Sequence, residues 1–426
     1  MLTWRAAALL ALTAGTLPLW QSPWVGLLVL AGGVALLSLV DFTLAAALRD
    51  LALSRDGART VRSGETATVS LRVRNGSTRP LRAEIRDAWV PSAGATPYSH
   101  RVVVQPDESA VLDTTLTPTR RGDRPAVRLT LRSYGPMGLA FRQRAGRPEM
   151  PQWTLRVLPR FDSRRFLPEK TARLRTLEGA TVTRGRGQGT EFDVLREYVI
   201  GDDVRSIDWR ASARRSDVLV RTWRPERDRR VVCVLDTGRT SAVLVGAEPR
   251  LDAAIDAAVL LAALASRAGD QVDLLAVDTA VRASVSGGRH VLLPRLVNAL
   301  APLQPSLVET DFELVVGEVL RRERKRALVV LFTALEPGAL GEGLLPVLPR
   351  LATRHKVLVA AVHDPLLRDL TSDPYLHAAT LRTLSERTRV KHALTRHGVE
   401  VLDAPADTFP SLLADTYLRL KRTGAL

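Results

Sequence analysis

The sequence predicts three parts: an apolar helical hairpin, an all-β sandwich, and an α/β domain with a doubly wound, mostly parallel sheet. Three patterns predict them. Two apolar segments stand at the N-terminus, apolar and polar residues then alternate with a period of two, and buried strands finally alternate with helical segments. The chain has 426 residues, which is enough for two or three domains with separate cores.

The charge of the chain is strongly positive but dispersed. The formal net charge is +16, from 61 basic and 45 acidic residues, and only five of the basic residues are lysines. The arginines occur throughout the chain rather than in one stripe, and aromatic residues make up only 5%, so few side chains can stack on bases. We therefore expect no nucleic-acid partner, but attraction to anionic membrane lipid. The single cysteine, Cys233, excludes a disulfide within the chain and a cysteine-based metal site.

The N-terminal 48 residues contain the two apolar segments, 2–20 and 24–40. As helices they would reach roughly 25 to 29 Å each, enough for a thin or tilted membrane crossing. Trp20 and Trp24 at the tip and arginines at the other end predict two spans, with both ends and the later domains in the cytoplasm. A cleaved signal peptide is the alternative, although no small-x-small cleavage site follows Leu17.

Residues 51–159 show the period of two. In 66–75 (TATVSLRVRN) apolar side chains fall on one face and polar side chains on the other, and 101–105, 110–116 and 126–132 repeat the pattern between turn residues. This predicts a small antiparallel sandwich of the immunoglobulin-like type, with no catalytic constellation and a role as spacer or recognition module. Residues 160–229 follow as a partly helical connector and a polar segment.

The polar segment, 185–215, reads GRGQGTEFDVLREYVIGDDVRSIDWRASARR. Its alternating glycines depart from the dinucleotide-binding fingerprint and no G-K-[ST] occurs, so we expect no phosphate cradle. Turn residues stand among large anchoring side chains, which predicts an ordered surface loop whose carboxylates pair with arginines. The alternative is a metal-dependent hydrolase that uses Glu191, Asp202, Asp203 and Asp208. Neighbouring arginines would neutralise such a cluster.

Strands and helices alternate from residue 230 to 426. The expected strands are 230–236, 272–277, 327–333, 356–363 and 399–402, with 281–285 as an edge hairpin. The expected helices are 250–266, 290–303, 311–322, 340–354, 376–397 and 408–422. This order predicts the doubly wound sheet.

Ligands of such a sheet bind beyond the carboxyl ends of its strands. The polar side chains expected there are Asp236 with Thr240 and Ser241, Thr333 with Glu336, His363 with Asp364, and Thr310 with Asp311. Their oxygen atoms would suit a hard cation such as Mg²⁺. The other interpretation is that these residues end strands and cap a helix.

A set of residues in and around the polar segment carries a family resemblance. They are Gly189, Glu191, Phe192, Arg196, Tyr198, Gly201, Asp202, Asp203, Arg205, Asp208, Trp209 and Arg214. With this set the chain resembles the bacterial family called domain of unknown function fifty-eight. Weaker similarity extends to the sandwich end 120–143 (RRGDRPAVRLTLRSYGPMGLAFRQ) and to an α/β domain similar to the von Willebrand factor A fold.

The resemblance implies a membrane-anchored protein that acts with a MoxR-type AAA ATPase in the assembly or maturation of other complexes. If the first apolar segment were cleaved, an exported adhesion-like A domain would be the alternative. Our leading hypothesis is an α/β domain that docks protein partners and has no catalytic residues.

The resemblance also implies a metal-adhesion site of the form D-x-S-x-S, with a Thr and a later Asp from other loops. Asp236, Gly238 and Thr240 occupy the first motif, and Thr310 fits the second element. Ala334 stands where the later Asp is expected. The implied site is thus degenerate, with Asp236, Thr240 and Thr310 as its remaining ligands. Mg²⁺ is the ion it would take, and a metal-free docking surface is the alternative.

Overall fold

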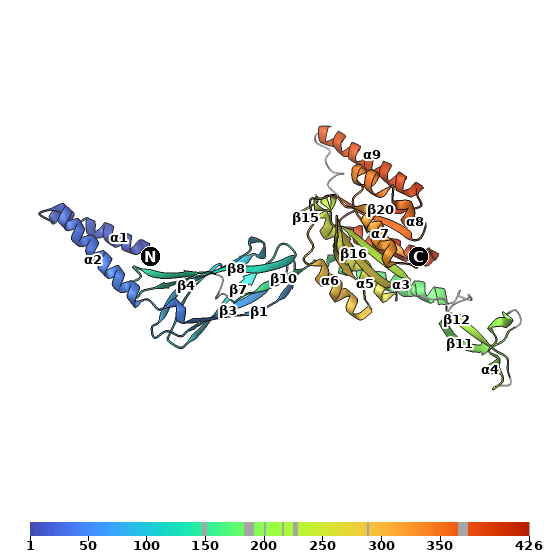
Figure 1. Cartoon of the computed structure of the whole chain (residues 1–426), viewed down its shortest axis with the longest axis horizontal. Helices are drawn as coiled ribbons and strands as arrows, with labels where there is room; N and C mark the ends of the chain where they lie inside the picture. The colour runs from blue at the N-terminus through green and yellow to red at the C-terminus, as the bar shows by residue number, and fades with distance from the viewer. Residues whose placement is uncertain are drawn as a thin grey trace. The chain divides into compact units, whose positions relative to one another are not determined.

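The computed structural model describes residues 1–146, 151–182, 191–199, 202–214, 217–224, 229–287, 289–364 and 374–425. The chain forms two compact units, Met1–Arg160 and Phe161–Leu426. The first contains the apolar helices and a β sandwich, and the second contains a mixed sheet with its helices (Figure 1).

One helix in the described part of the chain is long and apolar enough to cross a membrane. It is α2 (Pro23–Leu44), whose 22 residues give about 33 Å. The prediction of two spanning helices is supported for this helix only, because α1 (Trp4–Ala14) has 11 residues and is followed by a short 3₁₀ turn, η1 (Leu17–Leu19). The first segment breaks here because Pro18 donates no hydrogen bond and the Thr13 hydroxyl bonds to preceding carbonyl groups.

A buried carboxylate joins the end of α2 to the sandwich. Asp41 is fully buried, and it accepts hydrogen bonds from the backbone N–H groups of Met137 (2.7 Å), Leu139 (2.7 Å) and Ala140 (2.9 Å). These residues lie in the turn 135–140, where a Cβ added at Gly135 would clash with Asp41. We call this set of contacts the Asp41 latch.

The N-terminus contacts the same turn. The amino group of Met1 donates to the carbonyl oxygen of Phe141 (3.0 Å). The backbone N–H of Thr3 donates to the carbonyl oxygen of Leu139 (2.9 Å). The start of α1 and the end of α2 therefore meet at one turn of the sandwich, and α1 and α2 lie side by side (Figure 1).

The sandwich is built from two sheets. The first has the order β1-β3-β7-β5, and the second has the order β2-β10-β8-β4-β6 with β9 paired to β8. All pairs are antiparallel except β2 with β10. The strands are β1 (Leu51–Gly57), β2 (Thr60–Arg62), β3 (Ala67–Asn75), β4 (Leu81–Trp89), β5 (Ala95–Thr96), β6 (Ser99–Val104), β7 (Ser109–Leu116), β8 (Gly122–Tyr134), β9 (Phe141–Ala145) and β10 (Thr154–Leu158). The alternation predicted for 66–75 is confirmed, because the apolar side chains of β3 are buried in the core between the sheets.

Polar contacts within the second unit hold the connector after the sandwich. It comprises η4 (Asp162–Phe166) and α3 (Leu167–Val182), which confirms a partly helical connector. Buried Lys170 bonds both carboxylate oxygens of Asp415 at 2.8 Å. The Ser163 hydroxyl donates to Asp256 at 2.8 Å.

The central sheet of the second unit has the order β17-β16-β13-β18-β19-β20, and every neighbouring pair is parallel except β16 with β17. Its strands are β13 (Arg230–Asp236), β16 (Gln271–Val277), β17 (Val281–Val285), β18 (Leu328–Phe332), β19 (Lys356–His363) and β20 (Glu400–Pro405). These bounds agree closely with the predicted strands. The mostly parallel sheet places the carboxyl ends of β13, β16 and β18 at one edge.

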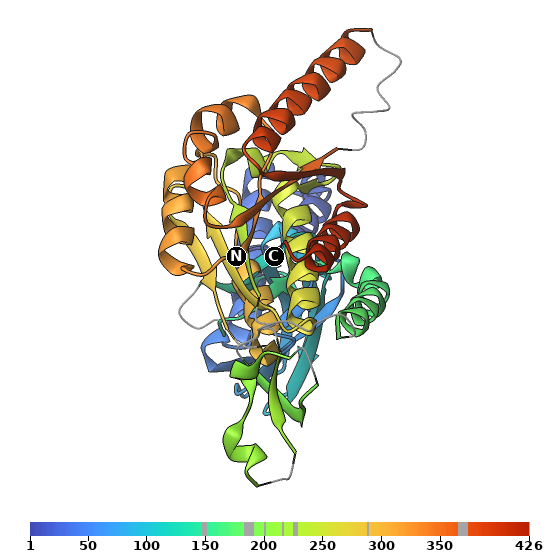
Figure 2. The same cartoon turned by 90° about the vertical axis from the view of Figure 1, so that its right-hand side faces the viewer.

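Helices cover both faces of this sheet. The helices are α5 (Arg250–Arg267), α6 (Arg289–Leu300), α7 (Phe312–Arg322), α8 (Leu348–Ala352), α9 (Pro374–Arg396) and α10 (Phe409–Thr423). In Figure 2, α5 and α10 lie on one side of the sheet, and the orange helices α7 and α8 lie on the other. The helix predicted at 340–354 is instead a π-helical turn (Ala339–Leu344) followed by α8, because Pro346 and Pro349 interrupt the backbone hydrogen bonds.

The Asp41 latch predicts a local weakening when its charge is removed. In Asp41→Asn, one amide oxygen replaces two carboxylate oxygens, so at least one of the three N–H groups loses its acceptor. A hydrogen bond to a charged acceptor contributes roughly 1.5 to 3 kcal/mol, so exchange of the amides of residues 137–140 should become at least about tenfold faster. Hydrogen exchange on the full chain in detergent measures this. Exposed Asp50→Asn is the control, and equal protection in the two variants would contradict the latch.

Asp256 predicts a pH dependence of the second unit. Burial raises the pKa of Asp256 to about 6, and the charge of Asp162 adds to the effect. The unfolded carboxyl titrates near 3.8, so the folded state binds more protons between these values, and Asp256 lowers stability as pH rises from about 4 to 6. Asp256→Asn keeps an acceptor for Ser163. Its Tm should exceed that of the wild type by a few degrees at pH 7.5, and the difference should vanish near pH 4. A difference that is constant over this range would contradict the assignment.

Candidate functional site

The candidate site is a hydrogen-bonded network around Asp236, the last residue of β13. Its side chain is buried at 2% exposure. The Oδ1 atom accepts from the N–H of Gly238 (2.8 Å) and from the Thr310 hydroxyl, and Oδ2 accepts from the hydroxyls of Thr240 (3.1 Å) and Thr333 (2.7 Å). Four donors from three loops thus converge on one carboxylate. We call these residues the Asp236 network.

A glycine makes this convergence possible. A Cβ added at Gly238 would clash with the Thr310 hydroxyl oxygen, so the Thr310 side chain occupies the space that a side chain at 238 would need. The carbonyl oxygen of Val308 holds the loop in place by accepting from the N–H of Arg239 (2.8 Å). The loop before α7 is therefore fixed against the end of β13.

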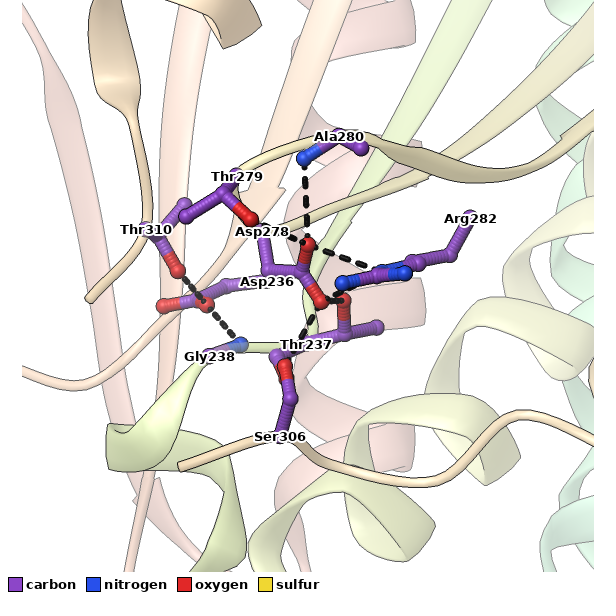
Figure 3. Close-up of polar contacts among 9 residues, drawn as sticks. All are labelled: Asp236, Thr237, Gly238, Asp278, Thr279, Ala280, Arg282, Ser306 and Thr310. Atoms are coloured by element: carbon purple, nitrogen blue, oxygen red, sulfur yellow. Dashed lines mark hydrogen bonds and ion pairs between the residues drawn. The ribbon is translucent and has the colours of Figure 1, made fainter. Parts of the chain in front are cut away.

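A second buried carboxylate lies beside the first. Asp278 follows β16 and is 1% exposed; its neighbours are drawn with Asp236, Gly238 and Thr310 in Figure 3. It accepts from Ser306 (2.6 Å), from the N–H of Ala280 (3.1 Å) and from Arg282 (2.7 Å). Burial alone would raise the pKa of Asp278, but these donors outweigh it and hold the pKa below the ordinary value of a carboxyl. Asp278 is therefore ionised at neutral pH.

Two arginines lie deep in the same edge of the sheet. Arg250 donates to the carbonyl oxygen of Thr240 (2.5 Å) and to Glu336 (3.3 Å), and burial lowers its pKa. Arg387 donates to Asp403 (2.5 Å), which also bonds His363 (3.0 Å). Glu336, predicted to face the crevice, thus neutralises an arginine instead.

The surface above the Asp236 network is a small hollow of about 240 Å³. Asp236, Thr240 and Thr310 belong to its lining, and Arg239, Glu309 and Glu342 supply its charged groups. Arg239 and Glu309 form an exposed ion pair (2.9 Å). The polar groups inside the hollow thus form hydrogen bonds with one another, and the side chains of Arg239, Glu309 and Glu342 lie at its rim.

The residues present do not fit a divalent cation as they lie. Each oxygen of Asp236 already accepts two hydrogen bonds, and the hydroxyl groups that a cation would bind donate to that carboxylate. The hydroxyl implied at 238 is missing, and buried Ala334 supplies no oxygen from its side chain. Among the described residues, no group of three or more His, Cys, Asp or Glu side chains is arranged to hold a metal.

The described part of the polar segment contributes a strand and two short helical turns to a β hairpin, rather than forming the predicted loop. Strand β11 (Glu191–Glu197) pairs with β12 (Leu219–Arg224) in antiparallel fashion, and η5 (Val204–Ser206) and α4 (Trp209–Ser212) lie between them. The alternation was hidden because the register shifts between Phe192 and Val194. Gly185, Gly187, Gly189 and Gly201 lie outside the described residues.

The carboxylates of this hairpin are engaged locally. Asp202 pairs with Arg196 (2.5 Å), and Asp203 accepts from the N–H of Arg205 (2.9 Å). Asp208 caps α4 through the N–H groups of Arg210 (3.1 Å) and Ala211 (3.0 Å), and it also pairs with Arg221 (2.7 Å). The N–H of Ala211, followed by Arg221 and then by the N–H of Arg210, lowers the pKa of Asp208.

Most of the other signature residues that the structure describes are exposed to solvent. Trp209 is 69% exposed, Arg214 and Arg205 are also exposed, and Tyr198 is half-buried. The side chains of Glu191 and Phe192 lie outside the described residues. The structure therefore brings the three described carboxylates onto one hairpin but gives each its own donors.

The structure assembles part of the crevice that the strand-end rule predicted. Asp236, Thr240, Thr310 and Thr333 come together, while Asp311 caps α7 by accepting from the N–H of Leu314 (2.9 Å). Ser241 turns back to the carbonyl oxygen of Asp236 (2.6 Å). The sequence analysis missed Asp278, although it directly follows a predicted strand and the same rule identifies it.

Loss of the Asp236 carboxylate should loosen this edge of the sheet. Asp236→Ala leaves three hydroxyls and one N–H without their acceptor, and an unsatisfied buried group costs about 1 to 3 kcal/mol. We expect the second unit to lose roughly 3 kcal/mol or more, measured by hydrogen exchange at the ends of β13 and β18 in the full chain. Glu309→Ala on the exposed rim is the control. Unchanged protection in Asp236→Ala would show that the network contributes no stability.

Comparison with solved structures adds only weak similarities. An aerotolerance-related membrane protein from Bacteroides fragilis is 11% identical, with 46% of this chain and 99% of that chain covered and a TM-score of 0.28. The CARDB domain of the PF1109 protein from Pyrococcus furiosus is 18% identical, with 27% and 90% covered and a TM-score of 0.20. These scores are too low to carry an argument about the fold.

The sequence comparisons give two relatives and one family model. The chain is 28% identical over 183 residues to the uncharacterized protein Rv1480 of Mycobacterium tuberculosis and, to the same degree, to the uncharacterized protein Mb1516 of Mycobacterium bovis. The match covers 42% of this chain and 56% of each relative, so the chain spans about half the length of the relatives it matches. Residues 194–392, from the hairpin to α9, match the model of the family described as Protein of unknown function DUF58.

Proposed function

We propose that this chain is a membrane-anchored, non-enzymatic docking protein, and that its second unit binds a partner at the hollow above the Asp236 network. The proposed partner is a MoxR-type AAA ATPase, with which the chain assists the assembly or maturation of other complexes. One observation supports the docking role. The polar groups at the bottom of the hollow form hydrogen bonds with one another, and charged side chains lie at its rim.

The size and charge of the hollow support a protein partner. Its volume of about 240 Å³ is below the range of roughly 300 to 1,000 Å³ typical of small-molecule pockets. A space of this size holds one or two side chains of another protein. Arg239, Glu309 and Glu342 at the rim would set the orientation of the partner, because rim charges govern specificity and association rate more than affinity.

The first unit supports a membrane anchor. Helix α2 has the length of a span, and Met1 and Thr3 bond to the turn that also holds Asp41. The exported adhesion-like alternative would require cleavage of the first apolar segment. We place the second unit in the cytoplasm, as the arginines at the hairpin ends predict.

The hairpin carboxylates offer less support for the hydrolase alternative. A catalytic metal needs carboxylates that are free to bind it. Asp202, Asp203 and Asp208 are each bonded to arginines or to backbone N–H groups of their own hairpin. We therefore propose a structural role for this segment.

Binding measurements test the proposed docking surface. The full chain, reconstituted in lipid nanodiscs, is presented to a purified MoxR-type ATPase from the same organism. Glu342→Arg reverses a charge at the rim of the hollow and should weaken binding about tenfold or more. Glu108→Arg, an exposed reversal on the sandwich, is the matched control and should change affinity less than twofold.

Two outcomes would contradict the proposal. Lack of binding by the wild-type chain would remove the ATPase as the partner. Equal loss of affinity in Glu342→Arg and Glu108→Arg would place the contact outside the hollow.

A further inference from the structure

Arginines gather on the outer face of the second sheet of the sandwich, next to the turn that holds the Asp41 latch. We call Arg5, Arg82, Arg101 and Arg132 the arginine face. Arg82 lies on β4, Arg101 on β6 and Arg132 on β8, and these strands are neighbours in the sheet. Arg5 is the second residue of α1 and lies at Gly138 of the turn.

One acidic residue stands among these arginines. Glu84 on β4 is directly opposite Arg101 on one side and Arg132 on the other. The Tyr134 hydroxyl, followed by the two arginines, lowers the pKa of Glu84, so its charge is present at neutral pH. Four positive charges and one negative charge leave a net charge of +3 on this face.

The arginine face borders a large hollow. Its volume is about 830 Å³, and all four arginines belong to its lining together with Trp4, Tyr134 and Phe141. Trp4 is 76% exposed. Aromatic side chains with one apolar and one wet side are typical of membrane interfaces. The hollow therefore combines cationic and aromatic groups.

The four arginines differ in whether their side chains already donate hydrogen bonds. Arg82 donates to the carbonyl oxygen of Pro136 (2.9 Å), and Arg132 donates to Gln143 (3.0 Å). Within the described parts of the chain, the side chains of Arg5 and Arg101 donate to no other residue, and both are exposed. Guanidinium groups in this condition can bind an incoming anion without breaking an internal bond.

We infer that the arginine face binds the anionic headgroups of the membrane lipids that surround the end of α2. This inference rests on the proposed anchoring of the chain by α2. The latch places the end of the helix at the turn 135–140, and that turn contributes Gly135, Pro136 and Gly138 to the hollow. A phosphodiester at the bilayer surface would meet the arginines, and the aromatic groups would contact the upper part of its acyl chains.

Lipid binding by the full chain tests this inference. The protein is purified in a neutral detergent and titrated with dioctanoyl phosphatidylglycerol, with dioctanoyl phosphatidylcholine and glycerol 3-phosphate as comparisons. Arg5→Gln/Arg101→Gln removes the two arginines whose side chains donate no hydrogen bond to another described residue. Arg120→Gln/Arg128→Gln is the matched control, because both are exposed arginines of the sandwich whose side chains donate to no other described residue.

The expected result is a preference for phosphatidylglycerol that depends on the arginine face. A basic residue near an anionic surface contributes about fivefold to affinity, so Arg5→Gln/Arg101→Gln should raise the apparent Kd roughly 25-fold. The control should change it less than twofold. Equal affinity for phosphatidylcholine, or an unchanged Kd in Arg5→Gln/Arg101→Gln, would overturn the inference. Glycerol 3-phosphate that binds as tightly as the lipid would show a free-phosphate site and would also overturn it.

Carbonate extraction of native membranes separates this failure from failure of the anchor. A chain that resists extraction but shows no preference for phosphatidylglycerol contradicts the arginine face alone. A chain released by carbonate contradicts the anchor, and the lipid inference then fails with it.

Discussion

Buried carboxylates need hydrogen-bond donors, and this constraint organises both units of the chain. A carboxylate removed from water is stable only where donors replace its hydration. Asp41 receives three backbone N–H groups, and Asp236 receives one N–H group and three hydroxyls. Asp278 receives three hydroxyls, an N–H group and an arginine. In each case at least one donor comes from a segment distant in sequence: the turn 135–140 for Asp41, Thr310 and Thr333 for Asp236, and Ser306 for Asp278. The carboxylate therefore fixes those segments to one another.

This constraint gives the two units different roles. In the first unit, Asp41 fixes an apolar helix to a β turn, and the neighbouring arginines then lie beside the helix end. In the second unit, Asp236 fixes the loop before α7 against the central strand, and the charged rim lies above that junction. A preformed surface of this kind suits binding, because little of it must be ordered when a partner arrives.

The sequence predicted the second unit well because its signals are local. Runs of buried apolar residues set the strands, and a polar residue at the end of a strand marks the crevice, which identified Asp236, Thr240 and Thr310. The strand β11 was missed because a register shift breaks its alternation. The short length of α1 was not predicted, because the hydropathy of the segment does not show the break at Pro18. The Asp41 latch joins residues 96 to 99 positions apart, and no local pattern reports such a contact.

Protein donors, rather than a cation, satisfy Asp236. Electron paramagnetic resonance of the full chain titrated with Mn²⁺ tests it directly, because bound and free Mn²⁺ give different spectra. The account predicts no stoichiometric binding in the micromolar range, with identical titrations for the wild type and Asp236→Ala. One tightly bound Mn²⁺ per chain that disappears in Asp236→Ala would contradict it.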